Sequence, residues 1–126
     1  MADVTGVEPA SELGVSAPAS GLDALEVTVR TIGVHARVAN LARANNLAVA
    51  VSDGAVLLAP DGRSRAAGIA HQIAGSAGTF GFPGASRLAA EIERILLVGE
   101  LDAGHLEIVG GHVEALLADL TGEPTY

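Results

Sequence analysis

The chain has no cysteine, no tryptophan and no lysine, and only one tyrosine and two phenylalanines among its 126 residues. Without cysteine, neither a disulfide framework nor a thiolate metal site is available. No run of about 18 apolar residues occurs, so no segment is predicted to span a membrane. The pattern of a secretory signal, a positive segment followed by an apolar stretch, is also missing after Met1. We therefore expect a cytoplasmic protein.

The charge balance is acidic, with fifteen carboxylates against seven arginines and a net charge of −8. Contacts to nucleic-acid phosphates require clustered basic side chains, and anionic membrane surfaces attract the same groups. Neither nucleic acid nor a membrane is therefore an expected partner. Apolar residues make up 49% of the chain but aromatic residues only 2%. The expected single core is therefore built mainly from Leu, Ile, Val and Ala, which suits closely packed helices.

Helical periodicity begins near residue 21. Residues 1–20 contain two prolines, two glycines and no periodic apolar face, and are predicted to be a flexible leader. Apolar residues then recur at three- and four-residue spacing, as in Leu22, Leu25, Val29, Ile32 and Ala36. Together with the turn residues, this spacing predicts an all-α, antiparallel up-and-down four-helix bundle over residues 21–122, followed by a tail at 123–126. The expected helices begin at Gly21, after Pro60, at Ala85 and around Asp102, and the last three end near Phe80, Gly99 and Gly122.

Residues 46–60 allow two interpretations. The apolar stretches on either side of Asp53-Gly54 fit a β-hairpin that turns on this pair. They equally fit the end of a long helix, a break at Asp53-Gly54 and an apolar connection to Pro60. We prefer the helical interpretation, because a lone hairpin is only marginally stable.

His71 lies on an unusual face of the second expected helix. On a helical wheel, residues with little or no side chain fall within about 60° of His71, while Ile69, Ile73 and Phe80 fall on the opposite side. Each glycine inside a helix costs about 1 kcal/mol relative to alanine. Either close packing against another helix or close approach of a partner protein to the imidazole explains this cost. The small residues are Ser64, Ala67, Gly68, Ala74, Gly75 and Gly78.

Residues 70–81 (AHQIAGSAGTFG) resemble the signature of histidine-containing phosphotransfer (HPt) domains, and residues 84–93 (GASRLAAEIE) resemble the helix that follows it. The resemblance is specific over residues 62–97 and rests on helical pattern alone from about 22 to 120. It implies that His71 accepts a phosphoryl group from a receiver-domain phosphoaspartate and passes it to another receiver, without catalytic turnover of its own. A docking surface for the partner is implied at Gly68, Gln72, Ala74, Gly75 and Gly78.

The resemblance also implies the partners, which are response-regulator receiver domains and a hybrid histidine kinase. Mg²⁺ is expected on the receiver, so we expect no cofactor and no metal site in this chain. His105 and His112 lie seven residues apart, too far for a zinc-binding pair on a helix, and His35 is expected at the surface. We expect a monomer, and a free-standing protein because the chain starts at Met1 and ends in a short tail.

One position departs from the family pattern. The lysine that often follows the histidine by three residues is Ala74 here. In an antiparallel bundle, residues 91–94 lie level with His71, so Arg94 is a candidate for the missing charge; a solvated arginine is the alternative. Two other functions stay open, namely a docking module that binds a receiver without accepting phosphate, and a structural or dimerisation bundle.

Overall fold

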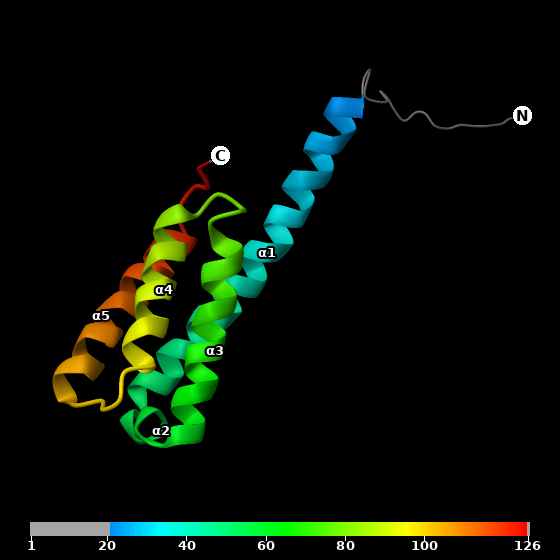
Figure 1. Ribbon diagram of the computed structural model, residues 1–126. Helices are drawn as coiled ribbons and strands as arrows, with labels where there is room; N and C mark the ends of the chain where they lie inside the picture. Colours follow the sequence, from blue (N-terminus) through cyan, green and yellow to red (C-terminus); the bar gives the residue numbers. More distant parts are fainter. Residues whose placement is uncertain (1–20, 126) are drawn as a thin grey trace, which may run out of the picture. The chain divides into compact units, whose positions relative to one another are not determined.

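The structure, a computed structural model, describes residues 21–125, and these residues form helices and connecting turns without any strand (Figure 1). None of the helices in this part of the chain combines the length and the apolar character that crossing a membrane requires. The predicted leader, residues 1–20, lies outside the described residues. The helices are α1 (Gly21–Ser52), α2 (Gly54–Leu58), α3 (Pro60–Ala77), α4 (Pro83–Leu96) and α5 (Ala103–Leu120).

The structure decides between the two interpretations of residues 46–60. The helix α1 continues to Ser52 and ends there, because the backbone leaves helical geometry at Asp53 (φ −104°, ψ 87°). A new helical turn then forms as α2, whose first hydrogen bond runs from Val56 N to Asp53 O at 2.9 Å. The hairpin alternative is therefore wrong. The four expected helices are present, and α2 is a fifth that replaces the expected irregular connection.

Among the described residues, 21–32 and 33–125 belong to two separate units. In the first unit, the described residues 21–32 are helical, and the side chains from residue 23 onward are exposed. Leu25, Val29 and Ile32, members of the predicted apolar stripe, are 59%, 43% and 47% exposed. In the second unit, α1 has four buried positions that sequence periodicity did not single out, namely Gly33, Asn40, Ala44 and Leu47.

The core of residues 33–126 is aliphatic, as the composition indicated. Phe82 is its only aromatic side chain among the described residues. Full burial of one Leu, Ile or Val side chain contributes about 1.5–3 kcal/mol. Alanines at the core face of α3 and α4 leave room for these helices to pack closely. The largest fully buried side chains include Leu47, Leu57, Ile73, Ile92, Leu96, Leu116 and Leu120.

Polar contacts connect α1 to the other helices of this unit. The buried Asn40 donates from Nδ2 to Ser76 Oγ at 3.2 Å and accepts from Arg43 at 2.8 Å, so its amide is satisfied. Arg37 donates from Nε to the Leu120 carbonyl oxygen at 2.9 Å, and its guanidinium lies 5.6 Å from the centre of the Phe82 ring. These contacts fix the register of α1 against α3 and α5.

Two helices of this unit begin at side-chain caps. The N-terminus of α4 is capped from α5, since Asp119 Oδ2 accepts from Ala85 N at 2.8 Å. The N-terminus of α5 is a capping box, in which Asp102 accepts from His105 N at 2.9 Å and His105 Nδ1 lies 3.3 Å from Asp102 N. The backbone N–H of His105 holds the pKa of the Asp102 carboxyl below its ordinary value.

Candidate functional site

His71 lies in the second half of α3 and is strongly exposed, with 73% of its side chain accessible. Its ring contacts one described side chain, that of Glu93 on α4. His71 Nδ1 lies 3.0 Å from Glu93 Oε2 and 3.2 Å from Oε1, and the Glu93 side chain is 26% exposed. The acceptor candidate is therefore an open imidazole held from one side by a partly buried carboxylate.

This contact selects a tautomer of the ring. An ionised carboxylate can only accept hydrogen bonds, so Nδ1 of His71 carries the hydrogen that Glu93 receives. In the neutral ring, Nε2 then has a lone pair and no hydrogen. The same arrangement, a carboxylate that accepts from Nδ1 and leaves Nε2 free of hydrogen, orients the histidine of catalytic triads, where Nε2 acts as a general base.

Gly68 and Gly75, predicted as part of the docking surface, border this imidazole along α3. Both are exposed, and a Cβ added at either position meets no atom of the described residues within 4 Å. Close packing within residues 21–125 therefore does not explain these two glycines. Their surface leaves the approach to His71 free of side chains.

Gly78 and Ala74 lie at the α4 side of this face. A Cβ on Gly78 would lie 3.3 Å from Ser86 Oγ, and that hydroxyl donates to the Ala74 carbonyl oxygen at 2.6 Å. Gly78 thus serves contact between α3 and α4, and half-buried Ala74 supplies a backbone acceptor to the same contact. Ala67, placed on this face by the helical wheel, is a core residue and is 4% exposed.

The polar neighbours of His71 on α3 differ from each other. Gln72 is exposed and makes no hydrogen bond within residues 21–125, so it is available to a partner. Ser76 receives the hydrogen bond of Asn40 and is half-buried, which gives it a packing role.

Arg94 is engaged on its own helix. Its guanidinium donates to the carboxylate of Glu91 three residues earlier, and this contact lowers the pKa of Glu91 and raises that of Arg94. Glu91 thus pairs with Arg94 and not with Arg87, which lies four residues before it on the same helix. The interval 91–94 does lie level with His71, as predicted, but Glu93 makes the contact. Sequence reasoning missed Glu93, although it lies inside that interval and a carboxylate is a common partner of histidine.

The remaining histidines lie elsewhere. His105 belongs to the capping box of α5, and His112 is half-buried on the same helix, close enough to Glu91 to lower its pKa slightly. His35 is exposed on α1, as expected.

Comparison with known families adds an independent observation. The model of the Hpt domain family matches residues 34–122, which is well over half of the chain and includes His71 and Glu93. Comparisons with curated proteins and with solved structures give no match. Members of this family carry phosphoryl groups in two-component phosphorelays and interact with response-regulator receiver domains. An exposed helical histidine, a glycine surface beside it and the family match agree, and the chain belongs to the HPt domain family.

Proposed function

We propose that His71 is the phosphoryl acceptor of a phosphorelay, taking the group from a receiver-domain phosphoaspartate and delivering it to a second receiver. The observation that carries the proposal is the geometry of the imidazole. It is 73% exposed, is oriented at Nδ1 by Glu93, and is bordered by glycines that leave its approach open. Direct docking of a receiver over the histidine requires an exposed ring with an open approach, and attack from Nε2 requires that the ring hydrogen lie on Nδ1.

The transfer is a displacement at phosphorus. The lone pair on Nε2 of His71 attacks the phosphorus atom, the Nε2–P bond forms, and the bond to the aspartate oxygen breaks, releasing a carboxylate on the donor. The ring keeps its hydrogen on Nδ1 and gains positive charge, which the Glu93 carboxylate at 3.0 Å stabilises. The reverse displacement by a second receiver's aspartate restores the neutral ring.

The remaining features of the proposal follow the family resemblance. Mg²⁺ and the acidic cluster belong to the receiver, so this chain needs no cofactor of its own. It acts as a phosphoryl carrier without catalytic turnover. The donor is the receiver of a hybrid histidine kinase, and the exchange takes place in the cytoplasm. We place α1, α3, α4 and α5 in the antiparallel up-and-down topology that presents His71 to the partner.

Ala74, at the position where the family often has lysine, supplies no positive charge to the phosphoryl group. With alanine at that position and Glu93 beside the ring, the chain offers no positive side chain in contact with His71 among the described residues. Arg94 can serve as this charge only by exchanging Glu91 for the phosphoryl group. The lack of a positive side chain beside His71 favours a second candidate function, a docking module that binds a receiver without accepting phosphate.

Incubating the full chain with a ³²P-labelled phosphorylated receiver and Mg²⁺ separates the two candidates. We expect label on the chain that is lost in acid and retained in base, as for a phosphoramidate, and no label on His71→Gln. The matched control is His35→Gln, which changes another exposed histidine and should label normally. Circular dichroism checks that both variants are folded. Labelled His71→Gln would exclude the assignment, and binding without any label would select the docking module.

A further inference from the structure

The outward side of α1 within residues 33–126 carries no charged side chain. Its large apolar members are strongly exposed, with Val34 and Val38 each 61% and Val49 69% accessible. The exposed residues between 34 and 52 are Val34, His35, Val38, Ala42, Asn45, Asn46, Val49 and Ser52. A surface helix normally places charged and polar side chains on its solvent side, and an apolar solvent side marks a surface that a partner covers.

The two arginines of this stretch, Arg37 and Arg43, do not add charge to the outward side of α1. Arg37 is half-buried and reaches the Leu120 carbonyl and the Phe82 ring, and half-buried Arg43 donates to Asn40. Both positive groups are thus held by the chain itself. By contrast, the exposed residues of α5 include Glu107 and Glu114. In a chain with a net charge of −8, this side of α1 lacks the like charges that would oppose the approach of a second copy.

Five of these eight exposed residues are arranged nearly symmetrically about Ala42. Residues 34, 38, 42, 45 and 49 follow one another at spacings of four, four, three and four, so they form one stripe along the helix. Val38 and Asn45 lie four and three residues from Ala42, and Val34 and Val49 lie eight and seven residues from it. If a second copy crosses at Ala42 in the opposite direction, each Val34 lies opposite a Val49. The small side chain at the centre permits the axial separation of about 8–10 Å of packed helices.

The flank of this stripe adds charge complementarity. Asp53 directly follows α1, and its backbone N–H still donates to the Val49 carbonyl oxygen at 3.1 Å. It lies 18 residues, or five full turns, from His35, so the two residues share one flank. Neither side chain makes a hydrogen bond or ion pair within the described residues. In the antiparallel crossing, His35 of one copy lies about one turn from Asp53 of the other, within reach of a hydrogen bond from its ring N–H to the carboxylate. The two-fold axis makes this pair twice.

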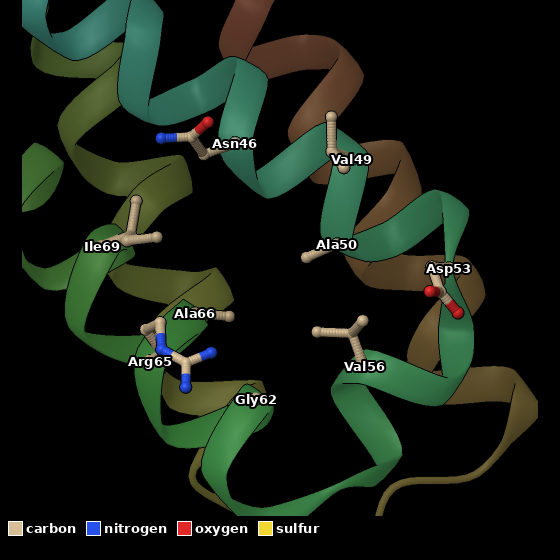
Figure 2. Close-up of a pocket in the computed structure, with 9 residues that line it drawn as sticks. All are labelled: Asn46, Val49, Ala50, Asp53, Val56, Gly62, Arg65, Ala66 and Ile69. Carbon is tan, nitrogen blue, oxygen red and sulfur yellow. The ribbon is translucent and has the colours of Figure 1, made fainter.

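A groove lies beside the stripe and is open to side chains of a second copy. It has a volume of about 310 Å³ and separates α1 from α3, with α2 at one end (Figure 2). Val49 and Asp53 lie on its α1 side, and Arg65 and Ile69 on its α3 side. Arg65, the other charged group that lines it, lies across the groove from Asp53 and makes no ion pair within residues 21–125.

We infer that a second copy of this chain covers the stripe, in a two-fold symmetric dimer whose α1 helices cross antiparallel at Ala42. An isologous interface requires one patch that is complementary to itself, and this stripe satisfies the requirement. The inference replaces the monomer expected from the sequence and does not depend on the phosphoryl transfer. On α3, His71 lies about 160° around the helix from Ile69, which lines the groove, so both acceptor histidines stay accessible in the dimer.

The first test is the mass of the full chain in solution, measured by sedimentation equilibrium from micromolar to millimolar concentration. We expect a dimer with twice the chain mass of 12.6 kDa. Ala42→Glu brings two carboxylates together at the axis and is expected to raise the dissociation constant at least about tenfold. The control is Ile108→Glu, which places the same charge at a 50% exposed apolar position of α5 and should not change dimerisation. A monomeric wild type, or equal effects of the two variants, overturns the inference.

The second test determines whether the partner is a second copy of this chain and whether the two α1 helices cross antiparallel. Because the chain contains no cysteine, a single introduced cysteine reports on one position. We expect Ala42→Cys to form a disulfide-linked homodimer on mild oxidation. Mixed Val34→Cys and Val49→Cys should cross-link to each other more than to themselves. Preferred Val34→Cys homodimers would indicate a parallel pair and refute the geometry, and no cross-link at Ala42→Cys would mean that a different protein covers this face.

Discussion

Replacing Glu93 tests the proposal that this carboxylate prepares His71 for attack. The carboxylate accepts from Nδ1 at 3.0 Å and thereby keeps the hydrogen off Nε2. In Glu93→Ala, nothing among the described residues holds that hydrogen on Nδ1, so part of the population has Nε2 protonated and cannot attack. The ring also loses the negative charge that stabilises it once phosphorylated. We expect slower transfer with unchanged binding of the receiver, because the effect acts through the imidazole.

The size of this effect follows from the exposure of the pair. A hydrogen bond to a charged group contributes about 1.5–3 kcal/mol when shielded from solvent. His71 is 73% exposed and Glu93 26%, so solvent screening reduces the contribution to about 1 kcal/mol. This corresponds to a rate reduction of roughly fivefold. Glu93→Gln keeps an oxygen acceptor without the charge, and its rate should lie between those of Glu93→Ala and the wild type.

Two measurements check the prediction. Single-turnover transfer from a phosphorylated receiver gives the rate, and ¹⁵N chemical shifts of the His71 ring give its tautomer. Glu91→Gln, which alters the neighbouring carboxylate that binds Arg94, is the matched control and should leave the ring unchanged. An unchanged tautomer in Glu93→Ala would refute the reasoning. So would faster transfer, which would mean that repulsion between Glu93 and the phosphoryl group outweighs the orientation of the ring.

Three further predictions follow from contacts near the site and in the bundle. Gly75→Leu should fold, because a Cβ there meets no atom within 4 Å, yet block transfer by holding the receiver away; normal transfer would assign this glycine no docking role. Gly62→Ala should lower the free energy of unfolding by more than about 2 kcal/mol, since its Cβ would overlap the Val56 carbonyl oxygen. Gly68→Ala, the matched change in open space on the same helix, should raise the free energy of unfolding by up to about 1 kcal/mol, and denaturant titrations that rank the two variants the other way would contradict this. The lowered pKa of Asp102 means that its carboxylate contributes stability that is present above the pKa of the unfolded chain and is lost as pH falls through the pKa of the folded chain. The difference in free energy of unfolding between wild type and Asp102→Asn should therefore be constant above about pH 5 and shrink below about pH 4, and a difference independent of pH would exclude the titration.

Local patterns in the sequence were sufficient for the four longer helices and for the isolation of His71. Periodicity and turn residues located α3, α4 and α5 to within a few residues, because spacings of three and four report directly on which side of a helix a residue occupies. The same spacing set His71 apart from Ile73, which is fully buried. It did not foresee α2, since five apolar residues between Asp53 and Pro60 carry no distinguishing period.

The sequence by itself therefore determined an all-helical chain and the isolation of His71 among small residues, since both depend on neighbours within about one turn. Only the tertiary structure brought Glu93 to His71, because residues 22 positions apart meet through the packing of α4 on α3. The tertiary structure also gives the glycines of this region different surroundings, which the residue type alone does not reveal. Gly62 and Gly78 face other parts of the chain, while Gly68 and Gly75 face open space, and this difference depends on atoms that arrive from α2 and α4.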